Sequence, residues 1–270
     1  CFRSWCRHCV RGKGCEAAHS STVPSENALP ILSFDYCYLS SSSHKSDIVP
    51  VTPPSSESPV LVVWDSRSRG LYAHLVPAKG IDFESFDTVI QLFSADLDTL
   101  GYKRVVFRSD TEVSIVAFLR ELRRHWSGEV VPEAAAAGDP QSNGAAEAAV
   151  KVFKKSVRTL KDALEHNLGC GPISPTSGLM SLIIKQSSAV QRLFAVGPDG
   201  RSPHERNTGR KHRLAVAEFW EAVWWMPLQT TATKLPPLGA RFEEGFYMGT
   251  HDGSAESVIL TPIGLVRCRR

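Results

Sequence analysis

Ala134-Ala-Ala-Ala-Gly-Asp-Pro-Gln-Ser-Asn-Gly-Ala-Ala-Glu147 is a loop of small residues that leads into a helix carrying an acid. The helix is predicted to begin near Ser142 or Asn143 and to end by Gly169, because Ser and Asn favour N-caps and Gly favours the C-terminal end. At about 100° per residue, one stripe of this helix is apolar and is predicted to pack into a core. That stripe consists of Val150, Phe153, Val157, Leu160 and Leu164.

A second stripe on the same helix is charged. Within roughly 40° of Glu147 lie four cations, which are Lys151, Lys154, Arg158 and Lys161. We call these four residues the basic ridge. An acid at the head of a basic ridge suits metal-dependent chemistry on a phosphate backbone, because cations hold the polyanion while the carboxylate holds the metal. The alternative interpretation is an ordinary solvated helix face.

Upstream of this helix, a second acid follows a strand. Residues 104–107 are predicted to form a strand, residues 113–126 a helix, and residues 129–131 a further strand that ends at Pro132. Asp110 lies at the junction between the first strand and the helix, where α/β folds often place binding residues. The same position is also that of a helix N-cap, with the helix beginning near Thr111.

A third acid lies in the earliest predicted strand, residues 29–39, which is otherwise apolar around Asp35. Burying a carboxylate in such a strand is costly unless it pairs with a cation, ligates a metal or lies at an exposed strand end. Asp35 is therefore either a ligand or a structural acid at the end of a strand.

The segments between these acids complete an α/β pattern. Residues 60–64 and 71–76 are predicted strands joined by a hairpin turn over residues 65–70, and residues 83–100 have helical periodicity. Residues 40–59 are rich in Ser and Pro and are predicted to be a low-complexity surface insertion.

Downstream, the pattern changes from helical to β-rich. A helix is predicted over residues 177–194, followed by a basic segment over residues 201–213 that is a candidate DNA contact. Three β-rich segments then follow Ala215, and we expect their tryptophans, Trp220, Trp224 and Trp225, to pack in a small core. The order predicts an α/β domain followed by a small all-β module.

The composition excludes two classes of protein. The chain has 270 residues, is 42% hydrophobic and carries a net charge of +3, so it has enough apolar surface to fold. It lacks an apolar run near the roughly 18 residues of a membrane-spanning helix, which predicts no membrane association. Seven Cys without a secretory signal favour an intracellular setting. Since the chain starts at Cys1, we expect a piece of a longer protein.

Three blocks together are similar to a known family. Ser33-Phe-Asp35, Arg108-Ser-Asp110 and Asp139-Pro-Gln-Ser-Asn-Gly-Ala-Ala-Glu147 resemble the three catalytic blocks of retroviral-type integrases, particularly those in the Pol polyproteins of copia-type or gypsy-type retrotransposons. Thirty-six residues separate Asp110 from Glu147, close to the family's usual spacing. The distance from Asp35 to Asp110 is longer than expected, and the insertion at 40–59 accounts for the excess.

The resemblance implies a ribonuclease H-like fold with a mixed five-stranded sheet, over residues 29–197, and a barrel-like module over residues 213–270. It implies that Asp35, Asp110 and Glu147 bind two Mg²⁺ or Mn²⁺ ions about 4 Å apart. It further implies DNA contacts by a mobile loop and by the helix that follows it. These contacts are Gln141, Ser142, Asn143, Lys151, Lys154 and Arg158.

The N-terminal segment, residues 1–20, contains a CxxC pair, Cys6 and Cys9. A thioredoxin-like site would open an apolar helix, whereas a basic Gly-containing stretch follows here. The family carries an N-terminal zinc module of two His followed by CxxC, so the resemblance implies a truncated Zn²⁺ site whose histidines precede Cys1. A local alternative adds Cys15 and His19 as ligands.

The function implied is metal-dependent processing of DNA 3′ ends and strand transfer, with homo-oligomerisation and nuclear localisation expected from the family. One alternative is a catalytically inactive or domesticated DNA-binding module. Another is a ribonuclease H-like nuclease.

Overall fold

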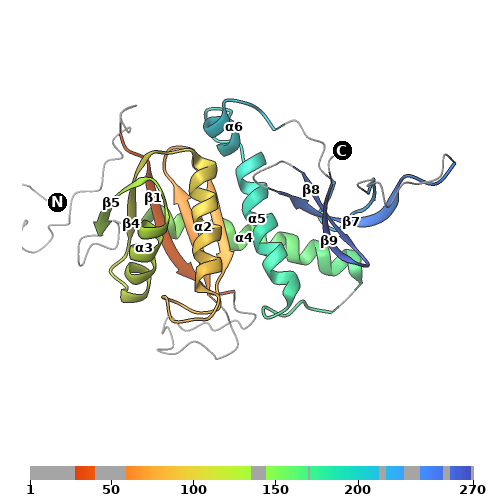
Figure 1. The fold of residues 1–270 in the computed structure, drawn as a ribbon, viewed down its shortest axis with the longest axis horizontal. Helices are drawn as coiled ribbons and strands as arrows, with labels where there is room; N and C mark the ends of the chain where they lie inside the picture. Colours follow the sequence, from red (N-terminus) through yellow and green to blue (C-terminus); the bar gives the residue numbers. More distant parts are fainter. Residues whose placement is uncertain are drawn as a thin grey trace, which may run out of the picture.

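The computed structural model describes residues 28–39, 59–134, 144–169, 171–212, 217–227, 238–251 and 256–268. These residues form a five-stranded sheet with helices and a second, four-stranded sheet (Figure 1). The first sheet consists of β1 (Ile31–Cys37), β2 (Val60–Asp65), β3 (Leu71–Leu75), β4 (Arg104–Ser109) and β5 (Glu129–Ala134). The helices are α2 (Phe86–Leu100), α3 (Val113–His125), α4 (Gly144–Leu168), α5 (Gly178–Phe194) and α6 (Pro203–Thr208).

The first sheet is mixed, with strand order β3-β2-β1-β4-β5. β1 lies at its centre, antiparallel to β2 and parallel to β4, and β4 is in turn parallel to β5. The parallel strands need crossover connections, and α2 and α3 supply them. The α/β class predicted from the order of elements is therefore confirmed.

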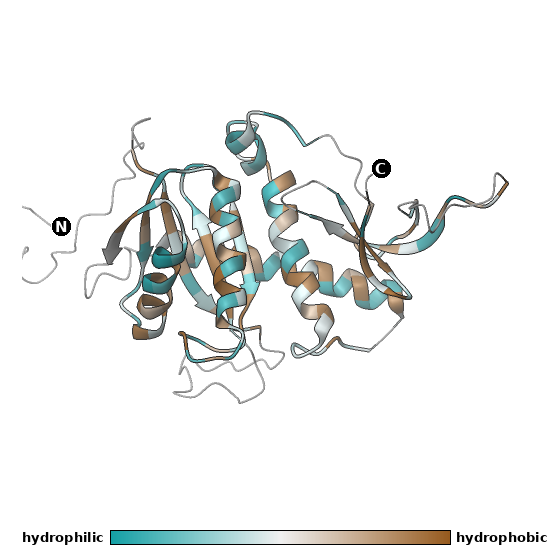
Figure 2. Ribbon diagram, viewed as in Figure 1, coloured by the Kyte–Doolittle hydropathy of each residue, from teal (hydrophilic) through white to brown (hydrophobic). Residues whose placement is uncertain are grey.

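Each face of this sheet packs against its own pair of helices. Leu32 and Phe34 of β1 belong to a core with α2 and α3, whereas Cys37 belongs to a core with α4 and α5. This division follows from the alternation of side chains along a strand. Figure 2 shows the result: the sheet, with its hydrophobic residues, lies between helices along which hydrophilic and hydrophobic residues alternate.

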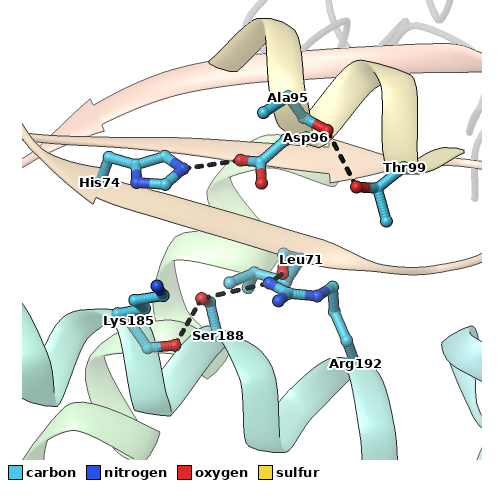
Figure 3. Close-up of polar contacts among 8 residues, drawn as sticks. All are labelled: Leu71, His74, Ala95, Asp96, Thr99, Lys185, Ser188 and Arg192. Atoms are coloured by element: carbon cyan, nitrogen blue, oxygen red, sulfur yellow. Dashed lines mark hydrogen bonds and ion pairs between the residues drawn. The ribbon is translucent and has the colours of Figure 1, made fainter. Parts of the chain in front are cut away.

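The edge strand β3 has polar contacts with helices on both sides (Figure 3). Nε2 of His74 lies 2.6 Å from the Asp96 carboxylate of α2. From the other side, Arg192 of α5 donates to the carbonyl of Leu71 at 3.3 Å. These contacts attach α2 and α5 to β3.

The end predicted for β5 was wrong. The strand continues past Pro132 to Ala134, and Phe107 of β4 pairs with Pro132. A proline has no N–H for a sheet, but β5 is an edge strand and has a neighbour on one side only. An edge strand tolerates a proline whose nitrogen faces away from the sheet.

The second sheet consists of β6 (Ala222–Trp225), β7 (Glu243–Thr250), β8 (Ser257–Thr261) and β9 (Gly264–Cys268), antiparallel and paired in that order. It is the predicted small all-β module, and its last β-rich segment forms a hairpin of two strands. Trp225 is buried in the core of this module, as predicted, whereas Trp220 is half-buried, stacked on Phe246 and packed against the core of α4 and α5 instead. The prediction was wrong for Trp224, which is 67% exposed, because alternation along β6 turns it away from Trp225.

The basic segment 201–213 contains α6, and one of its cations has partners within the protein. Arg206 pairs with Asp199 and also donates to the carbonyl of Ser68 at 2.9 Å. Arg206 therefore attaches α6 to the turn after β2, whereas Arg201 and Arg210 are exposed. In the part of the chain that the structure describes, no helix combines the length and the hydrophobicity needed to cross a bilayer.

Candidate active site

Asp35 and Asp110 are brought together by two adjacent parallel strands. The register pairs Ile31 with Val106, Leu32 with Phe107 and Ser33 with Arg108. Continued by two residues, the same register sets Asp35 of β1 opposite Asp110, which directly follows β4. Both side chains then point to the face of the sheet on which α4 packs, because Cys37, two residues after Asp35, contacts that helix layer.

The pKa of Asp35 reflects both its burial and its proximity to Asp110. Burial, the neighbouring Asp110 carboxylate and, more weakly, Glu147 raise the pKa of Asp35 to about 6, while a backbone hydrogen bond and Lys79 oppose the shift. Burial is the largest cause of the shift, and the Asp110 carboxylate adds to it because like charges disfavour one another's ionised form. Asp35 lies within β1 and is half-buried, which disagrees with the interpretation as an acid at an exposed strand end.

Asp110 is not the N-cap of α3, since that position belongs to Glu112 and the helix begins at Val113. Oδ1 of Asp110 instead accepts a long hydrogen bond of 3.3 Å from the N–H of Glu112. This bond holds the turn between β4 and α3. The N-cap alternative is therefore wrong.

Glu147 lies in the first turn of α4 and is exposed. Its helix has the predicted extent and the predicted apolar stripe, in which Phe153, Val157 and Leu164 are fully buried. Glu147 is close enough to influence the pKa of Asp35. Among the described residues, however, no group of three or more His, Cys, Asp or Glu side chains is close enough to hold a metal ion. Glu147 therefore lies near the two aspartates without completing a set of ligands with them.

The basic ridge divides into cations of two kinds. Lys161 forms an ion pair with Glu165, one turn later on α4. Lys151 and Arg158 are exposed, and within the described ranges neither forms an ion pair. Lys154 is half-buried, and its charge acts on the buried thiol of Cys37 at the end of β1, which places it beside the strand that carries Asp35. Three of the four predicted cations thus remain available to a ligand.

Lys79 is a neighbour of the site that the sequence analysis missed. Its ammonium, in the segment after β3, lies 2.8 Å from Oε1 of Glu112 and over the rings of Tyr36 and Tyr38. The N–H of Gly80 donates to the hydroxyl of Tyr36 at 3.3 Å. These contacts hold a cation next to Asp35 and link β1, the N-terminus of α3 and the segment after β3. They join residues more than 30 positions apart, so no local pattern indicates them.

Several predicted residues lie outside the described ranges. They are Gln141, Ser142, Asn143, Cys6, Cys9, Cys15 and His19. The loop contacts and the Zn²⁺ site therefore stay predictions.

No protein-family model matches the chain, and no curated protein is significantly similar to it in sequence. Solved structures are similar in fold. A simian T-cell lymphotropic virus intasome, in complex with the PP2A regulatory subunit B56 gamma, contains a chain with a TM-score of 0.52 and 11% identity. The match covers 97% of this chain and 84% of that one.

Two isolated catalytic cores are similar at lower scores. The BIV integrase core has a TM-score of 0.42 at 13% identity, covering 66% of this chain and 93% of that one. The HTLV-2 integrase core in complex with magnesium, in a trimeric form, has a TM-score of 0.42 at 11% identity, covering 66% and 95%. The strand order, the helix layers and the intasome match together identify the fold as the ribonuclease H-like fold of retroviral integrases, followed by a small β module.

Proposed function

We propose that this chain is a polynucleotidyl transferase that processes DNA 3′ ends and joins them to target DNA. The observation that carries this proposal is the register of β1 and β4, which sets Asp35 opposite Asp110 on the face where α4 brings Glu147. A polar cluster of this kind, with a raised pKa and a basic ridge beside it, suits chemistry on a phosphate backbone. The integrase fold supports the same conclusion.

The donor set suits Mg²⁺ or Mn²⁺, because these cations prefer carboxylate oxygens. Two ions bound there would supply the charge that activates the attacking oxygen and stabilises the leaving oxygen. Asp35 and Asp110 would provide the fixed ligands, since both are held by the central strands of the sheet. Glu147 would join them by a local movement of the first turn of α4, once bound cations offset the repulsion among the carboxylates near Asp35.

The chain's own residues would position the DNA. Lys151, Lys154 and Arg158 present cations along α4 to the phosphate backbone, and the loop with Gln141, Ser142 and Asn143 would border the reacting end. Lys79 keeps a positive charge beside Asp35 through its contact with Glu112. No covalent protein intermediate is required, because a water or a DNA 3′-hydroxyl serves as the nucleophile.

The wider context belongs to the same proposal. We infer a retrotransposon Pol origin, a catalytic core over 29–197 with the insertion 40–59, a β module over 213–270, and a Zn²⁺ module of which 1–20 is the last part. Self-association is expected, since the similar chain with a TM-score of 0.52 belongs to an intasome. Nuclear localisation would follow from action on chromosomal DNA.

A rival function is DNA binding without catalysis. The observation in its favour is that Glu147 does not complete a metal-binding group with the two aspartates among the described residues. An inactive, domesticated integrase would keep the basic ridge to bind DNA and would not need Glu147 to move toward the two aspartates.

One experiment separates the two functions. The full chain is incubated with a labelled DNA end and target DNA in Mg²⁺ or Mn²⁺, with and without chelator, and cleavage and joining are measured. Wild type should give joined product that chelator abolishes, and Asp110→Asn should reduce it by about 10³-fold or more, because a metal ligand is lost. Asp82→Asn, which changes an exposed carboxylate, is the matched control. Unchanged DNA binding without joining under any metal would support the rival, and cleavage without joining would indicate a nuclease.

A further inference from the structure

Lys79 and Glu112 form an ion pair beside the candidate active site, and neither is one of its three acids. Nζ of Lys79 lies 2.8 Å from Oε1 and 3.0 Å from Oε2 of Glu112, so the ammonium donates to both carboxylate oxygens. The two side chains are 31% and 36% exposed. The pair therefore joins the segment after β3 to the N-terminus of α3, two segments that are distant in the sequence.

Glu112 supports the turn that carries Asp110, because its N–H donates to Oδ1 of Asp110 at 3.3 Å. It occupies the N-cap position of α3, where a side-chain oxygen usually accepts from the backbone of the helix. Its carboxylate makes no such bond and accepts instead from Lys79 and, at 2.5 Å, from the Ser114 hydroxyl. Burial would raise the pKa of Glu112, but these two hydrogen bonds outweigh it and lower the pKa below its ordinary value. The carboxylate is thus ionised and engaged with Lys79.

Lys79 in turn contacts β1, the strand of Asp35. Its ammonium lies 5.2 Å from the centre of the Tyr36 ring and 5.7 Å from that of the Tyr38 ring, distances at which a cation is attracted to an aromatic face. The next residue, Gly80, donates its N–H to the Tyr36 hydroxyl at 3.3 Å. Tyr36 packs against the core of α2 and α3, the face of the sheet opposite to α4. Lys79 therefore contacts β1 through side chains that point away from the face of Asp35.

The strand pairing alone does not hold the two aspartates together. The ladder between β1 and β4 ends two residues short of both Asp35 and Asp110. The contacts of Lys79 and Glu112 span this gap, since they connect β1 to the turn after β4. We propose that the Lys79–Glu112 ion pair positions Asp110, by holding its turn against β1 so that the carboxylate stays beside Asp35. This role rests on the function proposed above, in which both aspartates are metal ligands. Lys79 acts through Glu112 and is a positioning residue.

The first test is the Mn²⁺ affinity of the full chain without DNA, measured by electron paramagnetic resonance. Lys79→Met should bind Mn²⁺ about tenfold more weakly, because a group that orients a ligand is lost. Lys79→Arg should restore most of the affinity, since a guanidinium can donate to both carboxylate oxygens and stack on a tyrosine ring. The matched control is Arg104→Met. It breaks an exposed ion pair with Glu129 at the opposite end of β4 and should leave the affinity unchanged.

The sign of the change distinguishes positioning from simple charge repulsion. A positive charge near a metal site repels the metal, so an ammonium that acted only through space would weaken Mn²⁺ binding, and Lys79→Met would bind Mn²⁺ more tightly than wild type. Tighter or unchanged binding in Lys79→Met would overturn the proposal, and so would an equal loss in Arg104→Met. If Lys79→Met does not fold by circular dichroism, Lys79→Gln decides the outcome by the same criteria.

A second measurement tests the positioning role without metal. Hydrogen exchange of the Glu112 amide, followed by nuclear magnetic resonance, reports the bond from that N–H to Asp110. Exchange should be severalfold faster in Lys79→Met and unchanged in Arg104→Met. If it is faster but wild type binds no Mn²⁺, the positioning role stands and the metal-dependent function falls. If Asp110→Asn loses Mn²⁺ affinity while Lys79→Met changes neither exchange nor affinity, only the positioning role falls.

Discussion

Asp35 and Asp65 are aspartates on the neighbouring strands β1 and β2, and they differ in their partners. Asp65 is fully buried and accepts hydrogen bonds from the N–H groups of Arg67 and Ser68, from the Ser68 hydroxyl and from the Tyr102 hydroxyl at 2.7 Å. Asp35 is half-buried, and its neighbours include the like charges of Asp110 and Glu147. The two acids differ in burial, but burial does not show which of them is held by hydrogen-bond donors and which lies among like charges. The set of partners does.

The largest effect is expected at Asp65. Asp65→Ala should lower the free energy of unfolding by about 3 kcal/mol or more, because it leaves the Tyr102 and Ser68 hydroxyls and two N–H groups without their acceptor. Urea unfolding followed by circular dichroism measures this, with Asp82→Ala as the exposed control. A loss below about 1 kcal/mol would mean that Asp65 is not the structural member of the comparison.

At Asp35, substitution in metal-free protein is expected to raise the free energy of unfolding, whereas at Asp65 it lowers it. Its pKa is about 6 in the folded chain, against about 3.9 for an unperturbed Asp. A raised pKa in the folded state favours folding below about pH 4, and this contribution is lost as the pH rises through about 6. At pH 8 the ionised carboxylate therefore destabilises the fold.

Asp35→Asn should accordingly raise the free energy of unfolding at pH 8 by about 1–2 kcal/mol, a value reduced for the partial exposure of the side chain. The gain should disappear at pH 4, where the native carboxyl is already neutral. Urea unfolding in chelator at the two pH values measures it. A variant that is less stable than wild type at pH 8 would place Asp35 in the same class as Asp65.

The same contrast exists among cations on α4 and predicts the smallest effect. Lys151→Ala or Arg158→Ala should each reduce the slope of log K for DNA against log salt by about 0.9, because one phosphate contact is lost. Lys161→Ala should change it less, since that ammonium already pairs with Glu165. Fluorescence anisotropy at several salt concentrations measures the slopes. If all three variants had the same slope as wild type, the basic ridge would be an ordinary solvated helix face.

Much of the fold and of the site follows from local sequence. The stripe on α4 and the acids in β1 and after β4 are visible because periodicity and strand ends are local properties. The continuation of β5 through Pro132 was not predictable, because it depends on β5 being an edge strand, which is a property of the whole sheet. The exposure of Trp224 was missed for a similar reason, since it depends on which face of β6 is covered.

Partners distant in sequence were also beyond prediction. Lys79 reaches Glu112 across 33 positions, and Asp65 meets Tyr102 across 37. Such pairs depend on the register of the strands, which no local pattern shows. They nevertheless decide which acid has hydrogen-bond or cation partners and which lies beside like charges. The identity of the candidate acids is thus a sequence property, whereas their electrostatic state is a property of the fold.

The most direct measurement of the central claim is the affinity of the full chain for Mn²⁺, followed by electron paramagnetic resonance without DNA. Asp110→Asn keeps the oxygen that accepts from the N–H of Glu112 but removes the charge, so the turn after β4 should persist. Wild type and Asp82→Asn should bind Mn²⁺ with equal affinity, and Asp110→Asn should bind it at least about tenfold more weakly, since a charged ligand is lost. Equal Mn²⁺ affinity in Asp110→Asn and wild type would contradict a metal site at Asp35, Asp110 and Glu147.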